Sequence, residues 1–97
     1  MIPSSAHVRF GPEGLARVDA SLHLSGASWI QCCTYDDQPP ILSVRDAHVS
    51  VAITVGDHAK VTVDDLDTAV QLAEAIAGYI AGLRRRLAAQ DQAADAA

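Results

Sequence analysis

Basic residues are scarce in this chain of 97 residues. Seven Lys and Arg stand against twelve Asp and Glu, which gives a formal net charge of -5. A surface that binds nucleic acid must neutralise phosphates with positive charge, so we expect no direct nucleic-acid binding. The chain also lacks the run of roughly 18 to 20 apolar residues that a membrane span requires, and no basic segment followed by an apolar run opens it. We therefore expect a soluble cytoplasmic protein with no membrane partner.

Cysteine is limited to two adjacent residues, Cys32 and Cys33. Neighbouring residues cannot join distant parts of the chain, which excludes the disulfide framework of small secreted domains. Adjacent side chains of a strand also point to opposite faces, which opposes a bond between the two. We expect structural free thiols, with a redox or metal role as the alternative.

The side chains that could act in catalysis or bind a ligand do not form a known motif. Asp36 and Asp37 precede two prolines, a composition typical of a solvated turn rather than of an acid–base pair. Residues 11–14 (Gly-Pro-Glu-Gly) lack the glycine spacing of a phosphate-binding loop. The histidines have neither helical spacing nor a cysteine partner for a metal site; they are His7, His23, His48 and His58. We expect no catalytic residue, no metal and no cofactor, and hence no enzyme.

The first third of the chain predicts a hairpin. Apolar and polar residues alternate without exception over residues 16–25, as in a half-buried strand. Ala6, Val8 and Phe10 alternate with polar neighbours in the same way. Residues 11–14 lie between the two runs and have the residue types of a turn. A short loop of this kind forces antiparallel pairing.

Further strands are expected up to residue 62. Residues 29–35 are rich in strand-forming residues on both faces, which predicts an interior strand or one contacted by a partner. Residues 41–45 and 49–55 predict two more strands, separated by a turn at Asp46-Ala47-His48. Lys60 to Thr62 can add a short edge segment.

The period of the apolar residues changes to that of a helix near Thr62. Thr62 with Asp65, or Asp64 with Asp67, can cap its start, and the acidic first turn suits the helix dipole. The helix is expected over residues 63–89, followed by a flexible tail at 90–97. The apolar stripe consists of Leu66, Ala69, Val70, Ala73, Ile76, Ala77, Ile80, Leu83 and Leu87.

These elements predict one α+β domain over residues 1–89, an antiparallel sheet of four to six strands with one long helix packed on it. A helix about 10 Å wide cannot cover a sheet more than about 20 Å wide. A second helix stripe of Leu72, Ala75, Tyr79 and Gly82 also needs a cover. We expect a homodimer interface there, since two-fold dimers are the commonest oligomers. The alternative is a monomer whose curled sheet wraps a broad helix face.

Arg84, Arg85 and Arg86 form the one basic cluster. Their position favours the negative end of the helix dipole, and successive residues point about 100° apart, so the three make no flat patch. They are also candidate contacts for an acidic partner.

The order of the predicted strands and helix resembles that of one known family. Alternating strands, a Pro39-Pro40 loop and a terminal helix that opens with residues 61–66 (Val-Thr-Val-Asp-Asp-Leu) resemble small actinobacterial accessory proteins of the BldB kind. The resemblance implies a cytoplasmic, dimeric, non-catalytic regulatory role and carries no site residues.

Three functions follow as hypotheses. The first is a non-catalytic homodimeric protein-interaction module, an accessory to a bacterial regulatory protein. The second is a small-molecule-binding protein with a pocket between sheet and helix near Trp29, Cys33 and Tyr35. The third is a small enzyme completed at a dimer interface.

Overall fold

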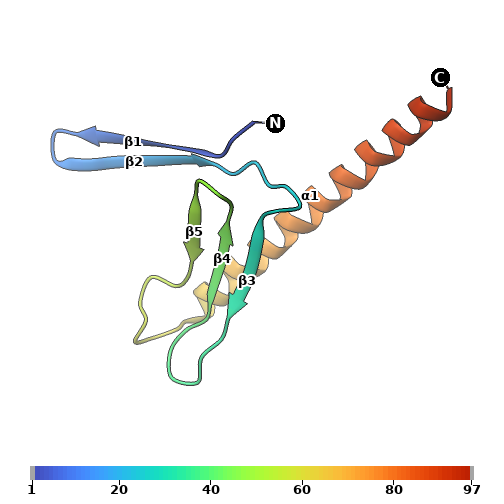
Figure 1. Ribbon diagram of the computed structural model, residues 1–97. Helices are drawn as coiled ribbons and strands as arrows, with labels where there is room; N and C mark the ends of the chain where they lie inside the picture. Colours follow the sequence, from blue (N-terminus) through green and yellow to red (C-terminus); the bar gives the residue numbers. More distant parts are fainter. Residues whose placement is uncertain (1, 97) are drawn as a thin grey trace. The chain divides into compact units, whose positions relative to one another are not determined.

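The computed structural model describes residues 2–96 and has an α+β composition (Figure 1). Five strands precede one long helix. The chain divides between Ala59 and Lys60 into two compact units, a strand unit and a helix unit.

The strand unit begins with the predicted hairpin. β1 (Ser5–Gly11) and β2 (Gly14–Ser21) are antiparallel, and Val8 pairs with Val18. Gly14 has a φ of 112°, which a residue with a side chain adopts only with strain, so glycine suits this turn. β2 ends at Ser21, before the predicted limit of residue 25, because β1 begins opposite it and offers no partner further on.

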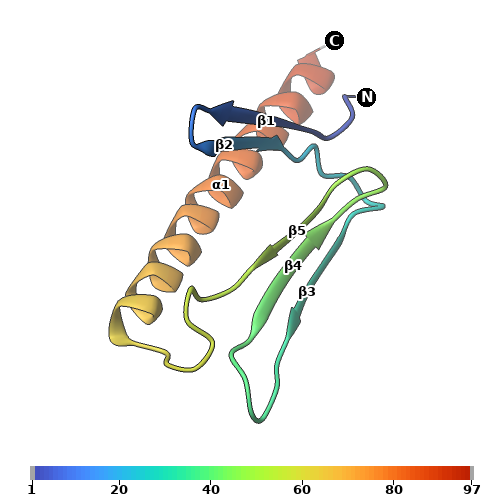
Figure 2. The same cartoon turned by 90° about the vertical axis from the view of Figure 1, so that its left-hand side faces the viewer.

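A second antiparallel sheet has the order β3-β4-β5 (Figure 2). It comprises β3 (Trp29–Cys33), β4 (Ile41–Arg45) and β5 (Ser50–Ile53). The five strands therefore form two sheets, where the sequence predicted one. β4 is the central strand, and β3, for which the sequence predicts an interior strand or one contacted by a partner, lies at an edge. The segment from Lys60 to Thr62 is not a strand.

The turn between β4 and β5 is held by Asp46, as its place in the sequence predicts. Its Oδ1 accepts hydrogen bonds from the backbone N–H groups of His48 and Val49, each at 2.8 Å. The N–H of Asp46 donates to the carbonyl of Val49 at 3.0 Å. A carboxylate that accepts bonds from the backbone two and three residues later is a local turn device, which explains why the chain reverses here.

The helix unit consists of α1 (Val63–Ala96), 34 residues long. Of the two predicted caps, the one formed by Thr62 and Asp65 is present: the N–H of Asp65 donates to Thr62 Oγ1 at 3.3 Å, and the N–H of Thr62 donates to Asp65 Oδ2 at 2.8 Å. The helix continues past the predicted end at residue 89. Ala, Arg and Gln propagate a helix well, and neither Gly nor Pro follows Gly82 to stop it.

Burial is slight throughout the described part of the chain. Ser4 and Pro39 are buried, whereas no described aliphatic, aromatic or sulfur-containing side chain is. Three apolar side chains of the central strand are half-buried: Ile41, Leu42 and Val44. Large apolar side chains of both units remain exposed, among them Phe10 and Tyr79.

Candidate functional site

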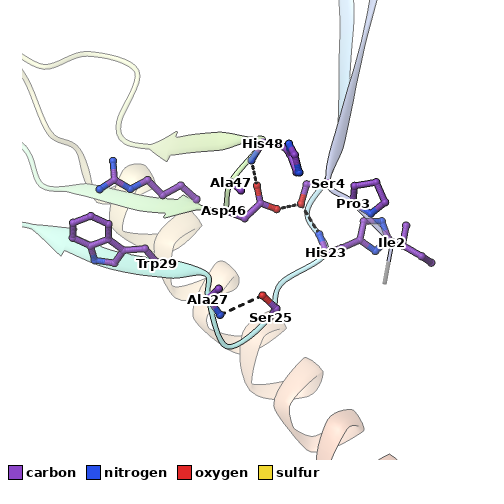
Figure 3. A pocket seen from close by; sticks show the side chains of 11 residues that line it. Ile2, Pro3, Ser4, His23, Ser25, Ala27, Trp29, Asp46, Ala47 and His48 are labelled. Carbon is purple, nitrogen blue, oxygen red and sulfur yellow. Dashed lines mark hydrogen bonds between the residues drawn. The ribbon is translucent and has the colours of Figure 1, made fainter.

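A cavity of about 690 Å³ lies in the strand unit (Figure 3). Its walls come from three segments: residues 2–4 before β1, residues 23–29 leading into β3, and residues 45–48 at the end of β4. No wall residue belongs to the helix unit. The cavity is thus positioned by the turn at Asp46 and by the connection between the two sheets.

Ser4 and Asp46 join these walls. The Ser4 hydroxyl donates a hydrogen bond to Asp46 Oδ2, and Ser4 Oγ accepts one from the backbone N–H of His23 at 3.0 Å. Ser4 is 7% exposed. Figure 3 shows both bonds, which tie all three segments together. We call this arrangement the Ser4–Asp46 bridge.

The bridge stabilises the charged form of Asp46. The Ser4 hydroxyl, followed by the N–H groups of His48 and Val49, lowers the pKa of this carboxyl from 3.8 to about 2. A carboxylate with so low a pKa is a weak general base. The serine proton points to this carboxylate and not to an imidazole, so the nucleophile–base geometry of hydrolases is not formed here. The arrangement serves to hold the cavity walls.

Trp29 and Arg45 add a cation–π pair to the cavity wall. They face each other in register across β3 and β4, with the guanidinium carbon 3.9 Å from the ring centroid. Trp29 is 53% exposed, so the ring stays accessible to a ligand. Of the three predicted pocket residues, only Trp29 lines this cavity; Cys33 lies at the far end of β3, and Tyr35 lies beyond it.

The predicted thiols and histidines fall in different places. Cys32 is exposed and Cys33 half-buried, and both thiols are free. His23 and His48 line the cavity, whereas His7 and His58 do not. Within residues 2–96 no three His, Cys, Asp or Glu side chains are grouped to hold a metal ion. The roles of the two cysteines stay predictions.

The predicted interface residues all lie on α1, and we call them the helix strip: Leu72, Ala75, Tyr79 and Gly82. Leu72 and Gly82 are half-buried, and Tyr79 is 59% exposed. Arg84, Arg85 and Arg86 lie one turn further on and are exposed. Their guanidinium groups make no salt bridge within the described residues.

Sequence reasoning missed the Ser4–Asp46 bridge. Asp46 could be found from the sequence, because an aspartate at the start of a turn commonly accepts hydrogen bonds from the backbone. Ser4 could not be found in this way, because its partner is distant in the sequence and the segment before β1 has no pattern of apolar and polar residues.

Comparison with known proteins yields no relative: no family model, curated protein or solved structure matches the chain. No described helix is both long and apolar enough to cross a membrane.

Proposed function

We propose that the protein is a non-catalytic homodimeric protein-interaction module, and the observation that supports this most is the breadth of the apolar face of α1. At about 100° per residue, its large apolar side chains extend over about 200° of the circumference. They are Val63, Leu66, Val70, Leu72, Ile76, Tyr79, Ile80, Leu83 and Leu87. All of them except Leu72 are exposed.

One layer cannot cover so broad a face. A helix packed on a sheet buries a stripe on the order of 100° wide. The strands β3 to β5 have four or five residues, about 13 to 17 Å, against about 51 Å for the 34 residues of α1. In this proposal one flank of α1 packs on the antiparallel strands of its own chain, in a single domain over residues 1–89. A second copy covers the flank that carries the helix strip.

The module acts, in this proposal, as an accessory to a bacterial regulatory protein in the cytoplasm, as its resemblance to the BldB kind implies. The net charge of -5 disfavours phosphate contacts, so the partner is a protein. Arg84, Arg85 and Arg86 contact acidic groups of a partner, which is the regulatory protein or the second copy of this chain. Titration with duplex DNA at moderate salt should show little binding, and binding that appears only with an added DNA-binding protein would support this role.

Concentration-dependent unfolding tests the homodimer. If folding and association are coupled, the urea midpoint of the wild type rises with protein concentration. Tyr79→Asp places a charge in the helix strip and should lower that midpoint, whereas Gln92→Asp, about 140° around α1 from Tyr79, should leave it unchanged. A wild-type midpoint independent of concentration across the micromolar range would reject the homodimer.

The cavity beside the Ser4–Asp46 bridge supports a second candidate, a small-molecule-binding protein. Its volume of about 690 Å³ is that of a typical ligand site, and Trp29 with the two imidazoles of His23 and His48 supplies an aromatic surface and polar groups. Trp29 is the one tryptophan, so its fluorescence reports any occupant. A metabolite library that leaves this fluorescence unchanged would remove the candidate.

A further inference from the structure

Four residues of α1 recur at intervals of seven: Asp65, Leu72, Tyr79 and Arg86. Ala75 and Gly82 lie three residues after Leu72 and Tyr79. Residues repeated every 3.5 positions on average form one continuous seam along a helix, the pattern by which two helices pack side by side. The helix strip is therefore the centre of a seam that ends in an acid and a base.

The charges at the two ends of the seam distinguish the directions in which a second helix can lie. Asp65 and Arg86 are about 32 Å apart along the axis at about 1.5 Å per residue. A parallel copy would place Asp65 against Asp65 and Arg86 against Arg86, which is repulsive. An antiparallel copy places each Asp65 beside an Arg86, and it also opposes the two helix dipoles.

The same antiparallel alignment matches the middle of the seam with itself. Its two-fold axis passes between Ala75 and Ile76, so Leu72 of one copy lies opposite Tyr79 of the other. A self-complementary patch is what a two-fold dimer requires. The size of the side chains fits the same alignment. Ala75 has a small side chain and lies beside the axis, where the two backbones come closest.

Asp65 can accept a bond from the second copy without losing its role in the cap. Its bonds to the N–H and hydroxyl of Thr62 use Oδ2, and a carboxylate has about four acceptor sites. Gly82 likewise has room in the single chain. A Cβ added there would meet only Arg85 Nη2, at an ordinary contact distance of 3.8 Å.

We propose that a second copy of this chain packs on the seam from Asp65 to Arg86 in antiparallel orientation, with Arg86 of each copy paired to Asp65 of the other. The inference rests on the proposed homodimer. It adds the relative direction of the two helices and their register to within about one helical turn.

Disulfide mapping tests the direction, in a chain whose Cys32 and Cys33 are replaced by serine. Ala75→Cys, beside the axis, should form a dimer by itself on mild oxidation. Thr68→Cys should not, because its two copies would be about 22 Å apart along the axis. A mixture of Thr68→Cys with Leu83→Cys should form the mixed dimer, since these positions lie opposite each other.

A second pair of variants tests the close approach without depending on disulfides. Gly82→Leu and Gly78→Leu both replace glycine with a better helix former, and nothing lies within 4 Å of a Cβ at Gly78. Gly82→Leu should raise the dimer dissociation constant at least tenfold, and Gly78→Leu, on the polar side, should not.

The outcomes separate the inference from the homodimer itself. A wild-type dimer in which Thr68→Cys couples to itself as readily as Ala75→Cys would overturn the antiparallel seam and leave the homodimer standing. Equal dissociation constants for Gly82→Leu and Gly78→Leu in such a dimer would also overturn the seam. A protein that stays monomeric would overturn both proposals.

Discussion

The hydroxyl of Ser4 donates a hydrogen bond to the carboxylate of Asp46, 42 residues later in the chain. The same oxygen accepts a bond from the backbone of His23, so one buried side chain connects the N-terminal segment, the approach to β3 and the turn after β4. With little apolar burial in this unit, such polar connections have a large share in holding its two sheets together.

Replacing Ser4 with alanine should destabilise the strand unit. The change removes a donor from Asp46 and an acceptor from the His23 N–H, which predicts a loss of about 1 kcal/mol in the free energy of unfolding. Urea unfolding followed by Trp29 fluorescence measures it. Ser5→Ala, at an exposed position of β1, is the matched control, and an equal effect of both changes would contradict the role given to Ser4.

Acid should weaken the same unit through Asp46. Its folded pKa of about 2 lies below the ordinary value of 3.8, so its contribution is fully present above about pH 5 and is lost as the pH falls through 4 towards 2. The unfolding free energy of the wild type should therefore fall more steeply over this window than that of Asp46→Asn. Parallel pH profiles for the two proteins would show that Asp46 has an ordinary pKa.

The cap of α1 predicts the effect of Thr62→Ala. Loss of the Thr62 hydroxyl leaves the N–H of Asp65 without its side-chain acceptor, at a cost of about 1 kcal/mol. Helix content by circular dichroism and thermal unfolding of the helix signal measure the loss. Thr68→Ala removes a hydroxyl that bonds back to the Asp64 carbonyl within the helix, and it should have a much smaller effect.

Local pairings were accessible to sequence reasoning. The hairpin was predicted because its turn lies between two runs that pair through it, and the cap because Thr62 and Asp65 are three residues apart. The end of α1 was missed because the lack of large apolar residues after Leu87 was given more weight than the helix propensity of Ala and Gln.

Pairings between distant segments were not accessible. Alternation predicts strands within residues 16–25 and 49–55 but does not say which strands share a sheet. The division into two sheets depends on β2 ending at Ser21, where β1 offers no further partner. The cavity and Ser4 were missed for the same reason, since their geometry follows from that division.

Sedimentation equilibrium of the wild-type protein at micromolar concentration measures whether the chain forms the homodimer through α1. We expect the mass of two chains for the wild type and for Gln92→Asp, and a shift towards the mass of one chain for Tyr79→Asp. A wild-type mass of one chain throughout that range would contradict it.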